Sequence, residues 1–300
     1  MRLTAIVPAT DRPEHVERVV AAIRAAEAPP DEVIVVDEAP RPGPAAARNL
    51  GAENADADVL VFVDSDVLPH HDAFRRIRDA FADEPKLAAL FGSYDDSPPA
   101  PGAVSGFRNL LHHFVHQQSG GEATTFWAGL GAIRRDAFVR AGGFDAERYA
   151  VPSIEDIELG MRLVGAGERL RLDPALQGTH LKRWTLAGML RTDLHGRGVP
   201  WVALLARESA APTGLNLGWR HRLSAAASIV LVSSLATRRP RQAALAVGAL
   251  VALNAQFYGL LLRRRGPVEA TLGVGLHALH HLTGAAAVPL GLLEHARERR

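Results

Sequence analysis

Three short apolar runs, separated by segments of helical periodicity, constrain the fold of this chain more than any other feature of its sequence. The runs are Leu3–Val7, Glu32–Val36 and Val59–Val63, and each ends at proline or at polar residues. Pro13–Ala26 carries apolar side chains at helical spacing, and Ala45–Asn54 follows the second run as another candidate helix. This alternation predicts an α/β fold whose parallel strands are covered on both faces.

Composition and charge exclude several classes of protein. The 300 residues include 34 Lys or Arg and 33 Asp or Glu. The strong basic excess of a dedicated nucleic-acid binder is therefore absent, and we expect no nucleic-acid partner. The sequence has no cysteine, which excludes disulfides, thiolate metal sites and cysteine nucleophiles. No signal-peptide pattern precedes the first apolar run, so we expect the first part of the chain to lie in the cytoplasm.

The composition of the chain changes near residue 218. Beyond Leu223 the sequence has nine arginines, no lysine and three acids, which gives this part a net charge of +6, whereas the first 222 residues carry −5. We therefore predict two parts. An α/β domain covers residues 1–218, and a hydrophobic, helical, membrane-associated region covers residues 219–300.

Three apolar segments in the second part are candidates for membrane association. They are Leu223–Ala236, Ala243–Leu262 and Leu272–Leu293. A helix needs roughly 20 apolar residues to cross a bilayer, and only the second segment meets this requirement unaided. Because arginine clusters flank every segment and usually stay in the cytoplasm, we expect the second and third segments to form a membrane hairpin and the first to lie in the interface. A soluble, alanine-rich helical subdomain is the alternative.

Two carboxylates follow the third apolar run. Asp64 and Asp66 are two residues apart, so both side chains can leave a regular strand on the same side. In open α/β sheets, ligands bind outside the carboxyl ends of the strands. Paired acids at that position suit Mg²⁺ or Mn²⁺, which would bind a diphosphate and neutralise the charge that develops as a nucleotide leaves. The alternative is that Asp66 caps the helix that follows it.

Polar residues also follow the first two runs. Asp37 ends the second run, and Pro8 and Thr10 end the first. A carboxylate in the position of Asp37 can accept hydrogen bonds from a nucleobase or a ribose hydroxyl, although a turn-forming aspartate before Pro40 is the alternative. Three strand ends would then converge on one polar crevice.

Several short motifs occur in a defined order over about residues 1–200. In chain order they are Val7-Pro8-Ala9-Thr10, Val36-Asp37-Glu38-Ala39-Pro40, Ala47-Arg48-Asn49-Leu50-Gly51, Asp64-Ser65-Asp66, Ala132-Ile133-Arg134-Arg135, Gly142-Gly143-Phe144-Asp145 and Ile154-Glu155-Asp156. Together they resemble the motifs of family 2 glycosyltransferases. The resemblance implies a GT-A fold, which is a doubly wound mixed sheet with flanking helices, and inverting transfer of a sugar from a nucleotide diphosphate sugar.

The resemblance also implies roles for individual residues. The donor would be bound by Pro8, Thr10, Asp37, Arg48 and Asp64, and Asp66 would be the main metal ligand. The adjacent acids of the last motif would be catalytic, with Asp156 as general base and Glu155 as a cap or an ion-pair partner. Independently of the resemblance, inversion needs a carboxylate that takes the acceptor proton opposite the leaving diphosphate. Acids in the first turn of a helix are also favoured by the helix dipole alone, which is the alternative.

Two departures from the family pattern leave details open. Glu38 stands where the family usually has a second aspartate, which leaves the donor's base open. His180-Leu181-Lys182-Arg183-Trp184 is similar to the Gln-x-x-Arg-Trp of processive relatives, with histidine at the first position, so processivity is also open. His180 is a candidate third metal ligand or a structural histidine. Lys182 and Arg183 are candidate diphosphate ligands or an ordinary basic pair.

An aromatic segment between the metal motif and the general base is a candidate acceptor site. The indole of Trp127 can stack on a sugar ring, and Gly129 would let the backbone approach it. Packing in the core is the alternative for Trp127.

The sequence thus predicts a metal-dependent glycosyltransferase of the hexosyltransferase type, with Mg²⁺ or Mn²⁺ as cofactor. We expect it at the cytoplasmic face of the plasma or inner membrane, with membrane lipid as a partner and a lipid-linked or glycan acceptor. A nucleotidyltransferase would need a glycine-rich loop after the first strand, which Pro8-Ala9-Thr10-Asp11-Arg12-Pro13 is not. A catalytically inactive membrane scaffold would have no need for three acids at one site.

Overall fold

The chain is divided into two compact units. The computed structural model describes residues 1–9, 13–207 and 218–299. Unit 1 comprises Met1–Asp95 and His116–Lys182, and unit 2 comprises Asp96–Val115 and Arg183–Arg300. The boundary after Lys182 lies earlier than the predicted boundary at residue 218. The physical reason is that α7 (Leu186–Arg191), the π-helical segment Thr192–Gly198 and α8 (Val199–Arg207) pack against α11 (Ala255–Glu298) inside unit 2.

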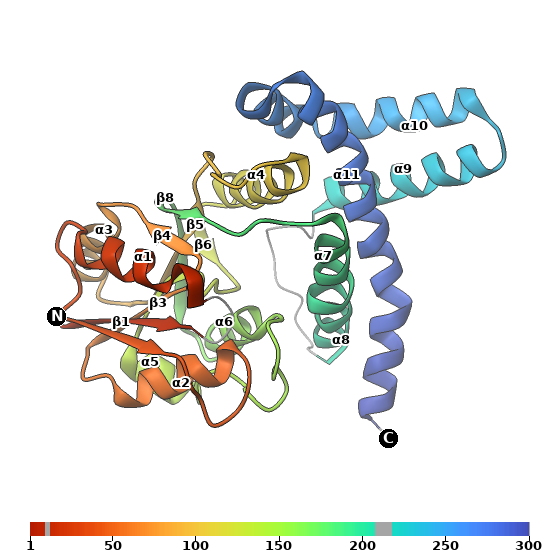
Figure 1. Ribbon diagram of the computed structural model, residues 1–300. Helices are drawn as coiled ribbons and strands as arrows, with labels where there is room; N and C mark the ends of the chain where they lie inside the picture. The colour runs from red at the N-terminus through yellow and green to blue at the C-terminus, as the bar shows by residue number, and fades with distance from the viewer. Residues whose placement is uncertain (10–12, 208–217, 300) are drawn as a thin grey trace. The chain divides into compact units, whose positions relative to one another are not determined.

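Unit 1 is built on one mixed sheet, which has eight strands within the described residues. The strands are β1 (Leu3–Pro8), β2 (Glu32–Val36), β3 (Val59–Val63), β4 (Val67–Pro69), β5 (Leu87–Tyr94), β6 (Gly121–Ala123), β7 (Leu130–Arg134) and β8 (Arg169–His180). Their order is β2-β1-β3-β7-β5-β8-β4, and β6 pairs with β8. Figure 1 shows the paired strands β1 and β3 side by side. The three predicted strands are present and parallel. The sheet becomes mixed because β7 lies antiparallel between β3 and β5.

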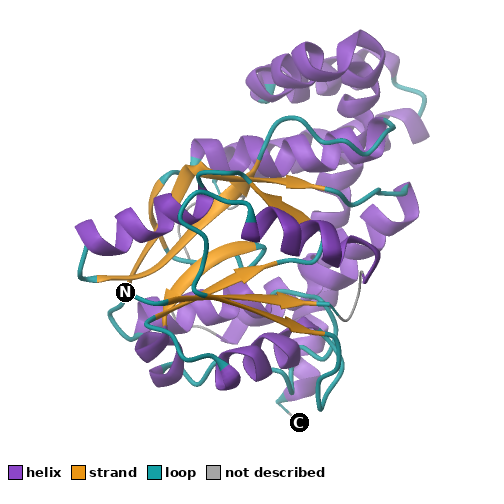
Figure 2. Ribbon diagram, turned by 60° about the vertical axis from the view of Figure 1, so that its left-hand side comes forward, coloured by secondary structure: helices purple, strands orange, loops and turns teal. Residues whose placement is uncertain are grey.

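Helices cover both faces of this sheet (Figure 2). They are α1 (Pro13–Arg24), α2 (Pro44–Asn54), α3 (Ala73–Asp83), α5 (Arg135–Arg140) and α6 (Glu155–Gly165). Side chains alternate along β1, so that Val7 packs in one core with α1 and α3, whereas Ile6 packs in the other core with α2, α5 and α6. Both side chains are fully buried. Burial on both faces explains why these strands are almost continuously apolar in the sequence.

Unit 2 is helical in the residues that the structure describes. Besides the helices named above it contains residues 103–115 of α4 (Ala103–Gln118), α9 (Trp219–Ala236) and α10 (Pro240–Leu253). Phe107 and Phe114 of α4, Met189 of α7, and Phe257 and Leu261 of α11 form its core.

The predicted apolar span Ala243–Leu262 is not a single helix. Helix α10 ends at Leu253 and α11 begins at Ala255, with a bend of 80° between them. The break lies at Asn254, whose side-chain amide donates to the carbonyl of Leu250 (2.9 Å) and to the hydroxyl of Ser224 (2.9 Å). A polar side chain that bonds to its own backbone in this way competes with helix continuation. Among the described helices, none alone is long and apolar enough to cross a bilayer, and only the bent pair α10–α11 meets that criterion by length and composition.

Candidate active site

The acidic pair lies on a turn that is fixed by neighbouring strands. Asp64 and Asp66 stand between β3 and β4. The N–H of Asp64 donates to the carbonyl of Gly129 (3.0 Å), immediately before β7, and the N–H of Leu181 donates to the carbonyl of Asp66 (2.8 Å), immediately after β8. These two backbone hydrogen bonds fix the turn that carries both acids. One joins it to the segment before β7, and the other joins it to the residue after β8.

Arg48 of α2 joins two of the candidate acids. Its guanidinium donates to Oδ1 of Asp64 (2.6 Å) and to Oε1 of Glu155 (2.8 Å), and the arginine is only 4% exposed. Burial by itself lowers the pKa of Arg48, but the charges of Asp64, Glu155 and Asp156 outweigh that effect and raise it. The donor-binding role of Arg48 stays a prediction; the structure shows that this arginine also joins the metal motif to the start of α6.

The environment of Asp64 acts on its ionisation in opposite directions. Burial raises the pKa of Asp64, the Arg48 guanidinium lowers it, and the nearby charge of Asp66 raises it, so that the net pKa lies above the ordinary value of 3.8. An added positive charge would relieve this repulsion and favour the ionised form of both aspartates.

Asp156 lies in the first turn of α6 and faces the segment before β7. Its Oδ2 accepts a hydrogen bond from the N–H of Ala128 (3.1 Å), and its Oδ1 accepts one from Ile157 (2.8 Å). Ala128 and Gly129 are adjacent, and Gly129 holds the backbone of Asp64. The metal motif and the candidate base are therefore held by the same short segment, and Arg48 bonds to Asp64 and to Glu155, the neighbour of Asp156. Glu155 points to the interior, where Oε2 accepts from the N–H of Ser153 (2.9 Å).

His180 ends β8 beside the acidic turn. Its Nε2 lies 3.7 Å from Oδ2 of Asp66, and its ring stacks on Tyr94 with centroids 4.1 Å apart. Tyr94 meets the edge of Trp127 (5.0 Å), and Trp127 meets His116 (5.5 Å). These rings form a packed row next to the acids, so the candidate acceptor residue Trp127 also has a packing role.

Gly129 is required by the same packing. A Cβ at this position would lie 2.3 Å from Cζ2 of Trp127, which is closer than real contacts allow. The predicted role of Gly129 in letting a sugar approach the backbone stays a prediction, and the structure shows that the Trp127 indole also lies close to this glycine.

The remaining predicted donor residues are distributed over both units. Pro8 is buried at the end of β1 and pairs with Val36 of β2, after which the exposed Asp37 follows. Thr10 lies outside the described residues. Lys182 is half-buried and is the last residue of unit 1. Arg183 is exposed and begins the second segment of unit 2, Arg183–Arg300.

The sequence predicted Asp64, Asp66 and His180 as ligands of a divalent cation. Within the described parts of the chain, no group of three or more His, Asp or Glu side chains is arranged to hold an ion. Two carboxylates on one turn are nevertheless an appropriate donor set, since Mg²⁺ is usually bound by one or two carboxylates together with substrate phosphates. The residues present therefore fit a cation that arrives with a diphosphate.

Comparison with known proteins points to one family. Residues 38–141 match the family described as "Glycosyl transferase family 2". The Pre-mycofactocin glycosyltransferase of two Mycobacterium tuberculosis strains is 28% identical over 183 residues, which are 59% of this chain and 38% of the relative. These findings support a family 2 glycosyltransferase. The chain spans 38% of the length of the curated relatives it matches.

A solved structure shows the same fold. The mannosyltransferase PcManGT from Pyrobaculum calidifontis, in complex with GDP-Man and Mn²⁺, has a TM-score of 0.54 and 18% identity, with 100% of this chain and 88% of that chain covered. The mixed sheet with flanking helices therefore matches the GT-A fold.

One acidic site of this glycosyltransferase fold was missed by the sequence reasoning. Asp95 is buried directly after β5, where it accepts a hydrogen bond from the hydroxyl of Thr179 and contacts Nε2 of His70 (3.1 Å). The available signal was its position after an apolar run, which is the position that Asp64 has after β3. The hydrogen bond that His70 donates to the Asp95 carboxylate raises the pKa of His70 above 6.5, against the lowering effect of partial burial.

We expect this His70–Asp95 pair to make the stability of unit 1 depend on pH. Because the folded-state pKa of His70 is raised, its stabilisation is complete below 6.5 and is lost as pH rises through the folded-state pKa. The half-exposed histidine limits the effect to less than about 1 kcal/mol. Urea unfolding measured across this range should show a decrease that His70→Gln removes and that the exposed neighbour control, His71→Gln, retains. An unchanged decrease in His70→Gln would contradict this origin.

Proposed function

We propose that this chain is an inverting, metal-dependent glycosyltransferase of the hexosyltransferase type, which uses a nucleotide diphosphate sugar. The observation that carries the proposal is the convergence of acids from separate segments at Arg48. Asp64 of the metal motif and Glu155, next to Asp156, both lie within hydrogen-bond distance of its guanidinium. The family match, the glycosyltransferase relative and the nucleotide sugar held by the PcManGT structure support the same reading.

Asp156 would act as the general base. Its carboxylate would take the proton of the acceptor hydroxyl while that oxygen attacks the anomeric carbon, on the face opposite the departing diphosphate. The N–H groups of Ala128 and Ile157 would orient the carboxylate. Attack from the opposite face inverts the configuration of the sugar.

The donor would lie along the ends of β1, β2 and β3. Asp37 would bind the nucleoside, and Lys182 and Arg183 would be partners of the diphosphate. A divalent cation held by Asp66, Asp64 and His180 would neutralise charge on the leaving diphosphate. The Mn²⁺ in the PcManGT structure supports this cofactor class.

We also propose that unit 2 associates with the cytoplasmic face of the plasma or inner membrane and that the acceptor is lipid-linked. Helix α9 supports this, because its buried residues are Ser224, Ser228 and Ser234. Its exposed large apolar residues are Trp219, Leu223, Ile229, Val230, Val232 and Leu235, besides the exposed Arg222 near its start. A helix of a water-soluble protein has the opposite arrangement, whereas helices in lipid pack through small residues and expose apolar ones.

Exposed apolar residues continue on the two following helices, although α11 also buries large apolar side chains such as Phe257 and Leu261. In α10, Ala243, Ala246 and Leu250 are buried. Exposed large apolar residues on α10 and α11 are Leu245, Val247, Val251, Leu262, Val268, Leu272, Leu279, Val288, Leu290, Leu292 and Leu293. Apolar surface of this extent marks an interaction with lipid or protein, and the flanking arginines favour anionic lipid.

Thermal unfolding of the full chain with a panel of nucleotides and nucleotide sugars tests the donor and metal assignment. We expect one base to stabilise the protein, with Mn²⁺ required, by about 2.7 kcal/mol at a ligand concentration of 100 times Kd. Asp66→Asn should remove the Mn²⁺-dependent part, whereas Asp79→Asn on the exposed face of α3 should retain it. Absence of stabilisation by every nucleotide, or full stabilisation of Asp66→Asn, would contradict the proposal.

A further inference from the structure

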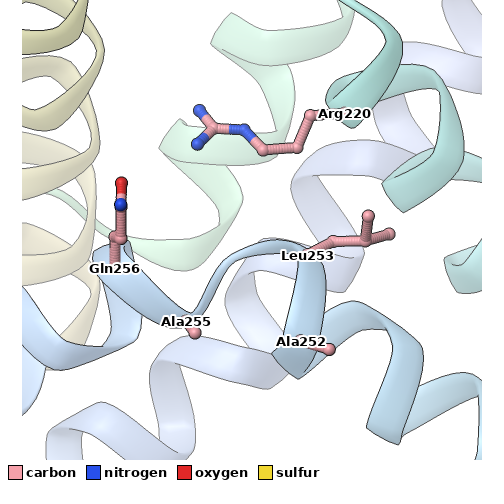
Figure 3. A pocket seen from close by; sticks show the side chains of 5 residues that line it. All are labelled: Arg220, Ala252, Leu253, Ala255 and Gln256. Carbon is pink, nitrogen blue, oxygen red and sulfur yellow. The ribbon is translucent and has the colours of Figure 1, made fainter.

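A cavity lies at the break between α10 and α11. Its volume is about 270 Å³, and its lining residues are Arg220, Ala252, Leu253, Ala255 and Gln256. Arg220 comes from the start of α9, and Gln256 from the first turn of α11. Figure 3 shows that their polar ends extend toward the same space above the three apolar residues. The cavity is thus lined by one cation and one amide, and otherwise by apolar side chains.

In the parts of the chain that the structure describes, no acid pairs with the charge of Arg220. No carboxylate among the described residues lies within ion-pair distance of its guanidinium, which instead packs over the ring of Phe114 at 5.3 Å. In the sequence, residues 209–268 contain eight arginines and no Asp or Glu. An anion in the cavity would therefore interact with the Arg220 guanidinium, and no carboxylate on α9 or α10 would compete for it.

The position of Gln256 adds to the attraction for an anion. Ala255 and Gln256 are the first residues of α11. The start of α11 and the end of α10, at Ala252 and Leu253, carry opposite partial charges at this break, so the added attraction comes from the Gln256 amide, which is a hydrogen-bond donor. A guanidinium together with such a donor matches the oxygens of a phosphate group.

The surface around the cavity favours a lipid as the source of that phosphate. Leu223, one turn from Arg220 on α9, and Val251, next to the lining residue Ala252 on α10, are both exposed. The volume of the cavity is below the roughly 300–1,000 Å³ of sites that enclose a drug-sized molecule, so it suits a head group and not a whole lipid. The acyl chains would lie on the apolar surfaces of the helices.

We infer that this cavity binds the phosphate head group of an anionic lipid. The inference rests on the membrane association proposed above and adds to it a defined contact, with Arg220 as the charged ligand. Sugar transfer does not enter the test, so failure of the glycosyltransferase proposal and failure of the lipid site are distinguishable.

Flotation of the full chain with lipid vesicles tests the site. The vesicles are phosphatidylcholine alone and an equimolar mixture of phosphatidylcholine and phosphatidylglycerol. We expect the wild type to prefer the anionic vesicles and Arg220→Gln to bind them about tenfold more weakly, as loss of a hydrogen bond to a charged group predicts. Arg220→Lys should retain most of the preference. Circular dichroism checks that each variant is folded.

Arg222→Gln is the matched control. Arg222 lies on the same helix and is exposed, but it packs over Trp219 and does not line the cavity. We expect this variant to bind within about threefold of the wild type, because an exposed charge acts through a screened field. Equal losses in Arg220→Gln and Arg222→Gln would overturn the site, and so would binding of the wild type to neither vesicle.

Inorganic phosphate distinguishes a lipid from a free ion. At ionic strength matched with chloride, we expect phosphate not to raise the thermal midpoint of the wild type or to release it from anionic vesicles. A phosphate-dependent increase in the midpoint that Arg220→Gln removes, without any preference for anionic vesicles, would overturn the assignment to lipid.

Discussion

Replacing Asp156 by asparagine should lower the rate of sugar transfer by about 10²- to 10⁴-fold, because positioned general-base catalysis contributes that much. Asparagine keeps the shape of the side chain and can still accept one hydrogen bond from Ala128 or Ile157, but it cannot take a proton. Transfer can be measured as release of nucleoside diphosphate in the presence of extracted membrane lipid. Donor binding should change little, since the base acts on the acceptor.

Asp136→Asn is the matched control for this substitution. The Oδ1 of Asp136 accepts a hydrogen bond from the next N–H, that of Ala137, as Oδ1 of Asp156 does from Ile157, and Asp136 lies at the exposed start of α5. We expect its transfer rate to equal that of the wild type. A similar rate for Asp156→Asn would show that another group removes the proton.

Replacing Arg48 by methionine should lower the free energy of unfolding by about 3–5 kcal/mol, because one substitution leaves two acids without their buried partner. Asp64 and Glu155 both depend on this guanidinium, and Glu155 is itself buried. Arg48→Lys should restore only part of the loss, since an ammonium cannot reproduce the two-pronged geometry of the guanidinium. Urea unfolding of the purified full chain measures the effect.

Arg76→Met provides the comparison for a surface pair. Arg76 binds Asp72 four residues earlier at the start of α3, and both side chains are about one third exposed. A pair of this kind contributes about 0.3–0.5 kcal/mol. If Arg48→Met lowered the free energy of unfolding no more than Arg76→Met does, Arg48 would not hold the acidic segments together. A role for Arg48 in donor binding would then be favoured.

The predicted strands and the acids that follow them could be derived from local sequence. Strands β1, β2 and β3 are short, apolar and buried on both faces, so periodicity and turn residues determine them. The direction of β7 could not be derived in this way. Leu130–Arg134 is a buried strand whatever its orientation, and its antiparallel position is fixed by pairing with β3 and β5.

The partners of charged residues were the least predictable part of the site. Arg48 is separated by 107 residues from Glu155, and no local pattern relates them. The role of Asn254 was missed for a similar reason. A single polar residue in an uncharged segment looks tolerable in a helix, but its bonds to Leu250 and Ser224 depend on the packing of α9 beside α10.

The anomeric configuration of the product is the most direct test of the proposed chemistry. A labelled nucleotide diphosphate sugar is incubated with the full chain, Mn²⁺ and extracted membrane lipid, and the new linkage is examined by nuclear magnetic resonance. We predict a product whose configuration is inverted relative to the donor and which Asp156→Asn does not form at a comparable rate. A product with retained configuration, or no transfer from any nucleotide sugar, would contradict the account.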